Sequence, residues 1–205
     1  MKKVPSSIKD ERLIKVRRDQ MIKGAVSLFK EKGFHKTTTR EIAKASGFSI
    51  GTLYEYIRTK EDVLFLVCDY IYERVKDQMG KKIDMDNMDE YSLKEAISAY
   101  FQLMDDMQDE VVVMYQEVKS LSKDAQEYVL NKERDMLELF EHVIKRSFPN
   151  EMTEEDVKLL ANNIFIQGQM WGFRRWILHK QFSLEAYTNR QLHYLFHGLS
   201  ITRGK

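Results

Sequence analysis

The chain has 205 residues, of which 43% are hydrophobic and 32% charged, and its formal net charge is +1. Such a composition supplies a buried core and excludes a disordered chain. Two prolines, nine glycines and the lack of alternating apolar and polar runs favour helices over strands. The longest apolar run, VLFLVC, is far shorter than the roughly 18 residues of a membrane span. We therefore expect an all-α protein of the cytoplasm.

Side chains that could carry catalysis or bind a metal are few. Cys68 is the single cysteine, and its place in the apolar run favours a core position over a redox role. His193 and His197 lie four residues apart on a predicted helix, but two ligands are too few for zinc, which favours an interface or surface role. The sequence shows neither a catalytic nucleophile with its general base nor a phosphate-binding glycine loop. We therefore expect no enzyme activity, no cofactor and no metal.

Charge is distributed unevenly along the chain. Residues 1–60 contain 15 Lys and Arg against 6 Asp and Glu, whereas residues 61–205 contain 18 against 26. A basic first third on an acidic remainder is typical of a protein whose first part alone contacts a polyanion such as nucleic acid. Solvation of helix faces by Lys and Arg is the alternative that charge alone leaves open.

The basic third begins with signals for two helices. Apolar residues at spacings of three and four predict a helix over residues 19–32, which ends at Gly33. Thr38 and Glu41 then form a capping-box pattern, in which each side chain bonds the backbone amide of the other. This pattern predicts the start of a second, short helix.

A third helix follows at once. Gly47 permits the positive φ of a tight turn, and Ser49 is a suitable N-cap for a helix that reaches about residue 57. Helix, glycine turn and helix in this order predict a helix-turn-helix. The second helix of that unit enters the DNA major groove N-terminus first, so that its first turn meets the bases.

Gly51 stands near the start of this third helix, where a glycine costs about 1 kcal/mol relative to alanine. Its missing side chain would let the backbone come close to a phosphate or a thymine methyl. Ile50 can contact such a methyl, and Thr52 can bond a base or a phosphate. We expect Tyr54 and Tyr56 to be exposed in the second turn and to reach sugar-phosphate oxygens, with packing inside the unit as the alternative for both.

Residues 33–67, GFHKTTTREIAKASGFSIGTLYEYIRTKEDVLFLV, resemble the DNA-binding domain of the TetR family of bacterial transcriptional regulators. The resemblance implies base contacts from Arg40, Ile50, Gly51 and Thr52, and phosphate contacts from Thr38, Tyr54, Tyr56 and Lys60. With the neighbouring polar residues, the expected DNA-facing set is Thr38, Thr39, Arg40, Ser49, Ile50, Gly51, Thr52, Tyr54, Tyr56 and Lys60.

A basic lead over residues 1–18 precedes the usual start of this family. It could lie in the minor groove beside the recognition helix, or it could be a solvated tail. The expected organisation is thus a basic arm at 1–18, a helix-turn-helix domain at 19–65 and a helical effector-binding and dimerisation domain at 66–205.

The remainder reads as a series of helices joined by short breaks. Apolar residues four apart predict a long helix over 60–79, which in the family acts as the lever between the domains. A polar break at 80–91 and Pro149 separate the later segments. N-cap patterns at Ser92, Thr153 and Ser183 help to delimit further helices, which we expect at 92–108, in a kinked stretch to 120, and at 123–147, 153–180 and 183–201.

The last two helices suit dimerisation, since family members pair them into an intermolecular four-helix bundle. Gly168 and Gly172 would let two helices approach closely, and the last helix has an apolar stripe formed by Leu192, Leu195, Phe196 and Leu199. Packing of that stripe in its own subunit is the alternative. A two-fold homodimer would match a palindromic operator.

Methionine and aromatic residues are frequent over residues 92–178 and favour either a core or an apolar pocket between helices. Arg174 and Arg175 beside Trp176 could meet an anionic head group. Weak similarity to lipid-responsive TetR regulators implies a fatty acyl-CoA or another amphiphile. The expected ligand-binding residues are Phe101, Met104, Tyr115, Phe140, Phe165, Trp171, Arg174, Arg175 and Trp176.

Together these patterns predict a homodimeric repressor that a small hydrophobic or amphiphilic effector releases from double-stranded operator DNA. The alternative is an unregulated architectural DNA-binding dimer without an effector pocket. Ligand-induced release from DNA distinguishes the two hypotheses.

Overall fold

In a computed structural model, which describes residues 4–82, 89–149 and 151–202, every regular element is helical. This confirms the expected all-α class. None of the helices in these ranges is long and apolar enough to cross a membrane. The chain divides into two compact units, formed by residues 1–73 with 109–133 and by residues 74–108 with 134–205.

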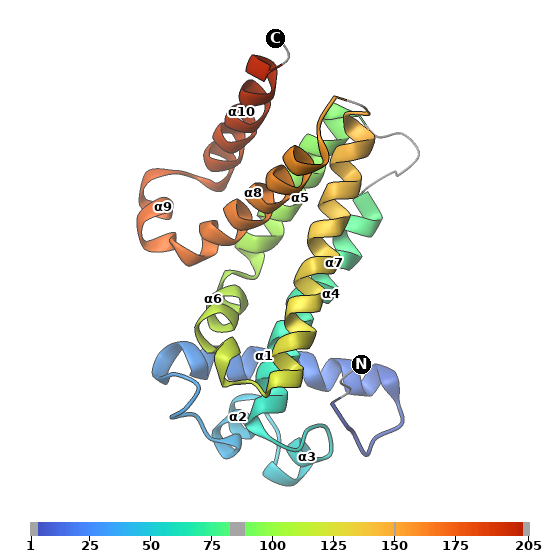
Figure 1. Cartoon of the computed structure of the whole chain (residues 1–205). Helices are drawn as coiled ribbons and strands as arrows, with labels where there is room; N and C mark the ends of the chain where they lie inside the picture. Colours follow the sequence, from blue (N-terminus) through green and yellow to red (C-terminus); the bar gives the residue numbers. More distant parts are fainter. Residues whose placement is uncertain (1–3, 83–88, 150, 203–205) are drawn as a thin grey trace. The chain divides into compact units, whose positions relative to one another are not determined.

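The first unit begins with three helices, α1 (Glu11–Lys32), α2 (Thr39–Ala45) and α3 (Ile50–Tyr54), shown in Figure 1. α1 crosses α2 closely at Gly24, where an added Cβ would lie 2.8 Å from the Ser46 Oγ. Buried apolar side chains from the three helices, among them Met21, Ile42 and Leu53, form the core beneath α3. α3 therefore rests on a closely packed core.

Four further elements complete this unit. They are the first part of α4 (Lys60–Lys82), then α6 (Gln108–Glu117), a short 3₁₀ turn η1 (Val118–Ser120) and the first part of α7 (Lys123–Ser147). Cys68 of α4 is fully buried, and burial raises the pKa of its thiol to about 12. This confirms the core position expected for it, because a protonated, buried thiol is inert.

The second unit contains the rest of α4 and α7 together with α5 (Glu90–Asp106), α8 (Glu154–Phe173), α9 (Arg175–Gln181) and α10 (Leu184–Thr202). Tyr100 of α5 lies at its centre. The Tyr100 ring packs edge-on against Phe140 and parallel to Phe165, with centroids 5.0 and 6.0 Å away, and its hydroxyl donates to the Phe165 carbonyl oxygen. Aromatic packing thus joins α5, α7 and α8.

Several predicted helix boundaries are wrong. α1 begins at Glu11, because the Asp10 carboxylate caps the amides of Arg12 and Leu13, so the second half of the expected arm is helical. α5 begins at Glu90 because its N-cap is Asp89, whose carboxylate accepts from the Ser92 amide. Ser92 therefore lies in the first turn of the helix and does not cap it. The helix expected to reach residue 180 breaks at Arg174, whose φ of −101° and ψ of 21° leave the helical region.

The sequence predicted that the two glycines of α8 let helices of two subunits approach closely, but in the structure both lie against residues of their own chain. A Cβ at Gly168 would lie 2.4 Å from the Tyr100 ring, and one at Gly172 would lie 3.1 Å from the Gln108 Cβ. Both glycines are buried, and the absence of their side chains allows α8 to pack closely against α5 and against Gln108 just beyond its end.

Several sequence predictions fall on residues outside the described ranges. Lys2 and Lys3 of the basic lead lie there, as do residues 83–88 of the polar break at 80–91. The Leu199 side chain of the apolar stripe also lies outside the described part of the chain.

Gly168→Ala tests the close packing of α8. The new methyl group cannot fit without moving the buried Tyr100 ring, so we expect the free energy of unfolding to fall by about 1–3 kcal/mol. Gly80→Ala, at an exposed position of α4 with nothing within 4 Å of the new Cβ, should instead raise it by up to about 1 kcal/mol. Urea unfolding of both variants measures the pair, and equal effects would refute the packing argument.

Candidate DNA-binding surface

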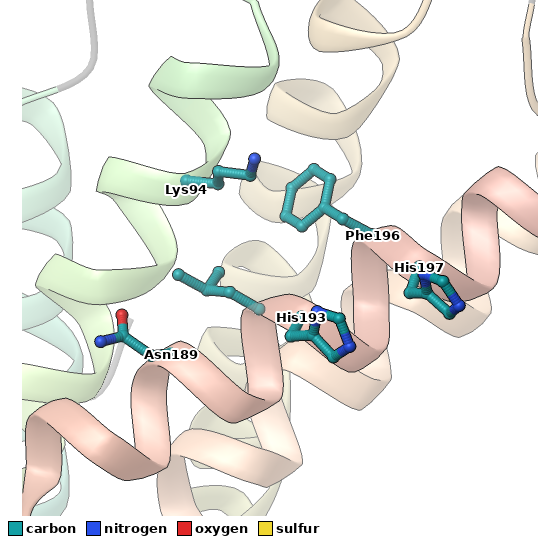
Figure 2. A pocket seen from close by; sticks show the side chains of 6 residues that line it. Lys94, Asn189, His193, Phe196 and His197 are labelled. Atoms are coloured by element: carbon teal, nitrogen blue, oxygen red, sulfur yellow. The ribbon is translucent and has the colours of Figure 1, made fainter.

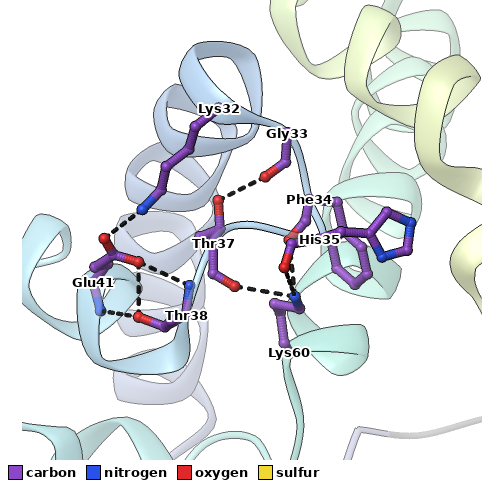
Figure 3. Close-up of polar contacts among 8 residues, drawn as sticks. All are labelled: Lys32, Gly33, Phe34, His35, Thr37, Thr38, Glu41 and Lys60. Carbon is purple, nitrogen blue, oxygen red and sulfur yellow. Dashed lines mark hydrogen bonds and ion pairs between the residues drawn. The ribbon is translucent and has the colours of Figure 1, made fainter.

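The capping box at the start of α2 forms as the sequence predicts (Figure 3). The Thr38 amide donates to the Glu41 Oε2 at 3.0 Å, and the Glu41 amide donates to the Thr38 Oγ1 at 3.3 Å. Lys32 at the end of α1 pairs with the other oxygen of the same carboxylate. Glu41 therefore ties the end of α1 to the start of α2.

Lys60 closes the turn between α1 and α2 from the other side (Figure 3). Its Nζ donates to the carbonyl oxygens of Phe34, His35 and Thr37 at 2.8, 3.2 and 3.0 Å. The same ammonium stands 4.3 Å from the centre of the Phe34 ring. Because all three of its donors are engaged, Lys60 has a structural role that sequence reasoning missed, and its predicted phosphate contact stays a prediction.

The start of α3 exposes both polar and apolar side chains to solvent. The Ser49 Oγ caps the helix by accepting from the Thr52 amide at 3.0 Å, as predicted, and Gly47 before it has a φ of 76°. Ile50 is 36% exposed and Tyr54 50% exposed. Thr39 of α2 reaches the Tyr54 hydroxyl at 3.1 Å, which brings residues of both helices onto one surface.

Gly51 has no structural requirement within its own chain. A Cβ built there would have one neighbour within 4 Å, the Ser49 Oγ at the ordinary contact distance of 3.7 Å. An alanine would fit and would favour the helix. The open space above Gly51 is thus available to a partner molecule.

The expected exposure of Tyr56 is wrong. α3 ends at Tyr54, so Tyr56 falls in the following turn and not in a second helical turn. Its side chain is 3% exposed and lies in the core of the unit with Leu53 and Ile57. The remaining predicted DNA-facing side chains, Thr38, Thr39, Arg40, Ser49, Ile50, Thr52, Tyr54 and Lys60, are exposed or half-buried.

The N-terminal segment, residues 4–10, packs on this unit. The Ser7 amide donates to the Glu55 carbonyl oxygen at 2.9 Å, and the hydroxyls of Ser6 and Ser7 reach the same oxygen. The Arg18 guanidinium donates to the Val4 carbonyl oxygen at 2.6 Å. The segment thereby supports the end of α3, and no local sequence pattern predicts this role.

Most of the predicted ligand-binding residues fill the core of the second unit. Phe101, Met104, Phe140, Phe165 and Trp171 are each 3% exposed or less. Phe101, Phe140 and Phe165 surround Tyr100, and the Trp171 indole donates to the Asp105 Oδ1 at 2.6 Å. Core packing, which the sequence left open as the alternative to a pocket, thus accounts for these five residues.

The other four predicted ligand-binding residues do not join that cluster. Tyr115 belongs to the first unit and is 41% exposed. Trp176 is 56% exposed, with the exposed Arg174 guanidinium 5.6 Å from its ring centre, and Arg175 beside it is half-buried. An amphiphile that uses both groups stays a prediction.

A shallow pocket of about 370 Å³ lies between α5 and α10 (Figure 2). Lys94, Asn189, Leu192, His193, Phe196 and His197 line it. The two imidazoles stack with centroids 5.2 Å apart, and the Lys94 ammonium lies 4.6 Å from the centre of the Phe196 ring. Within the described ranges no three metal-ligating side chains gather, so this surface does not form a complete metal centre.

The Glu41 carboxylate makes stability depend on pH. Hydrogen bonds from Lys32 first, and then from the Thr38 hydroxyl and amide, lower the pKa of Glu41 from 4.5 to about 2. Such a group stabilises the fold above its unfolded pKa and loses that contribution as pH falls through its folded value. Urea unfolding should therefore show wild type losing its advantage over Glu41→Gln between pH 5 and about pH 2.

Glu31→Gln, at an exposed position of α1, is the control for this experiment. Its unfolding curve should follow wild type more closely than that of Glu41→Gln across the range. Parallel pH dependences for wild type and Glu41→Gln would contradict the assigned role.

Gly51→Ala separates folding from binding. Because the methyl group fits and alanine favours the helix, the free energy of unfolding should rise by about 0.5–1 kcal/mol. DNA affinity should fall, since the methyl group occupies space needed by the approaching DNA. Unfolding and DNA titration measure the two effects, with Gly80→Ala as the control that stabilises without weakening binding. Unchanged affinity in Gly51→Ala would remove the explanation for this glycine.

Comparison with known proteins agrees with this architecture. Residues 21–67 match the family model of bacterial regulatory proteins of the tetR family, and residues 90–176 match the tetracyclin repressor-like C-terminal domain. The chain is 28% identical to the HTH-type transcriptional regulator HbdR of Aromatoleum sp. (strain CIB) over 203 residues, which cover 98% of this chain and 89% of HbdR.

Solved structures share the fold. A tetR-family regulatory protein from Rhodococcus RHA1 superimposes with a TM-score of 0.77 at 21% identity, covering 88% of this chain and 95% of the other. AibR, solved with isovaleryl coenzyme A and operator DNA, superimposes with a TM-score of 0.71 at 17% identity, covering 88% and 98%. With both family domains matched in order along the chain, the protein belongs to the TetR family of DNA-binding transcriptional regulators, which are not enzymes.

Proposed function

We propose that the protein is a homodimeric repressor that binds a palindromic operator and leaves it when a small amphiphilic effector binds. The observation that carries this proposal is the first turn of α3, where Ile50 and Gly51 are exposed and Thr52 is half-buried, on the surface that α2 joins through the contact of Thr39 with Tyr54. A regulator of this kind works in the cytoplasm, where bacterial DNA is found.

Base reading falls to the first turn of α3 and to Arg40. The open position at Gly51 lets the backbone come close to a base pair, and Ile50 offers an apolar contact for a thymine methyl. Tyr54, held by Thr39, presents its phenol to the sugar-phosphate backbone. Phosphate contacts of this type position a protein without reading sequence.

Dimerisation is supported by an apolar face on α8 that the described residues of its own subunit leave exposed. Leu159 is 63% exposed and Ile166 48% exposed, and their spacing of seven residues puts them on one side of the helix. Tyr194 of α10 is 61% exposed. Exposed apolar faces of this kind mark interaction sites, and a two-fold partner is the occupant that fits a palindromic operator.

A fatty acyl-CoA is the effector we propose to test first. A cation beside an exposed indole, as in Arg174 and Trp176, suits an anionic head group with an apolar chain. The structural neighbour AibR was solved with an acyl-CoA and operator DNA. α4 contributes residues to both units, so a ligand that displaces it would change the spacing of the two recognition helices.

Selection of binding sites from random double-stranded DNA tests the proposal. We expect an inverted repeat, because a two-fold dimer places one α3 on each half-site. Arg40→Ala should reduce the preference for the selected site over scrambled DNA by about tenfold, the loss of one base contact. Tyr54→Phe should weaken both DNAs alike.

Palmitoyl-CoA should then release the selected DNA, with free coenzyme A and palmitate as controls. Failure to select any site would overturn the DNA-binding role. A selected site that no acyl-CoA releases would overturn the proposed effector and favour the unregulated architectural dimer.

A further inference from the structure

Two exposed imidazoles lie side by side on α10 (Figure 2). His193 and His197 are four residues apart, so their side chains project from one face of the helix. Their ring centroids are 5.2 Å apart, and the ring planes are inclined by only 18°. Neither imidazole has a hydrogen-bonding or ionic partner among the described residues, so the ring nitrogens of both are available as ligands.

Two such rings can bind one metal ion. Imidazole binds a transition metal through a ring nitrogen at about 2 Å, so two nitrogens that share an ion lie no more than about 4 Å apart. Nearly parallel rings with centroids 5.2 Å apart reach this distance when they tilt towards each other, and exposed side chains change rotamer rapidly. The spacing is also that of the two zinc-binding histidines in the HExxH motif, which lie on one helix face.

The cationic side chains near the pair are engaged elsewhere. Lys94 of α5 lines the same pocket, but its ammonium pairs with the Glu90 carboxylate at 2.7 Å and lies over the Phe196 ring. Arg190 is the one Arg or Lys of α10, and its guanidinium lies 5.9 Å from the centre of the Phe182 ring, just before the start of the helix. The Glu90 carboxylate offsets the Lys94 charge, which therefore adds little repulsion to a metal ion bound by the imidazoles.

Two protein ligands suit an open site and not a structural zinc site. Structural zinc takes four protein ligands, and within the described ranges no third metal-ligating side chain joins the pair. Imidazole is a good ligand for Ni²⁺, Cu²⁺ and Zn²⁺, and Cu²⁺ binds most tightly among the first-row divalent ions. Cu²⁺ and Ni²⁺ also accept square-planar or tetragonal sites of nitrogen and oxygen ligands. Two imidazoles with water at the remaining positions satisfy such an ion.

We propose that His193 and His197 chelate one divalent ion of the late first-row transition metals per chain, with Cu²⁺ bound most tightly. The pair borders the pocket between α5 and α10, and Tyr194 of the proposed dimer face is not among the residues that line this pocket. The site uses none of the residues assigned to DNA or to the acyl-CoA. Metal binding therefore goes beyond the proposed function, and the two proposals can fail independently.

Titration with Cu²⁺ tests the proposal. The untagged full-length protein, without DNA, is titrated by isothermal calorimetry in glycine, which competes weakly for the ion. We expect one ion per chain. His193→Gln and His197→Gln should each weaken binding about 100-fold, because the chelate loses the effective concentration that one imidazole gives the other. The double variant should bind little more weakly than either single variant, since one substitution already breaks the pair.

A pair of variants with equal histidine content shows whether spacing makes the site. Asn189 is exposed one turn before His193, so Asn189→His in the His197→Gln background restores two imidazoles four residues apart. This variant should recover most of the lost affinity. Tyr194→His in the same background places the second imidazole on another side of the helix and should leave binding weak.

His142→Gln, at the exposed single histidine of α7, is the control and should bind Cu²⁺ as wild type does. Circular dichroism shows whether each variant is folded, and if one single variant unfolds, the other still decides the question. Wild-type affinity in a folded single variant, or equal affinity in the two variants of equal histidine content, would overturn the proposal. One ion per two chains would also overturn it, because the site would then lie between two copies.

Discussion

The arrangement of the DNA-binding unit depends on one ammonium group. Lys60, the first residue of α4, donates to three carbonyl oxygens in the turn that follows α1. Those carbonyls have no helical partner, and a charged donor satisfies them with strong hydrogen bonds. On the far side of the same turn, Glu41 pairs with Lys32 and caps α2. Two charged side chains thereby fix α1, α2 and the start of α4 as one frame for α3.

Helix starts were predictable where the cap lies within four residues of the groups it bonds. Thr38, Ser49, Thr153 and Ser183 each accept the backbone amide that their sequence pattern predicts. Local bonding of this kind is written in the sequence itself. The failure at Ser92 follows from competition, because Asp89 accepts from both the amide and the hydroxyl of Ser92 and its negative charge suits a helix N-terminus better.

Features that depend on distant residues could not be predicted in the same way. The burial of Tyr56 follows from the early end of α3, which a periodicity of apolar residues does not reveal. The path of the N-terminal segment is fixed by bonds to Glu55, almost 50 residues away. Its basic composition suggested an arm for DNA, whereas in the structure Arg18 of this lead donates to the Val4 carbonyl oxygen.

The glycines show why a residue type alone does not define a role. Gly168 and Gly51 both stand inside helices and both lower helix propensity by about 1 kcal/mol relative to alanine. At Gly168 the buried Tyr100 ring fills the space of the missing side chain, so packing within the chain repays the cost. At Gly51 no side chain of the described residues fills that space, since the one neighbour of an added Cβ, the Ser49 Oγ, stays at the ordinary contact distance of 3.7 Å. A destabilising glycine that its own fold does not need is best explained by a molecule outside the fold, and its position in the exposed first turn of α3 is the reason we propose DNA as that molecule.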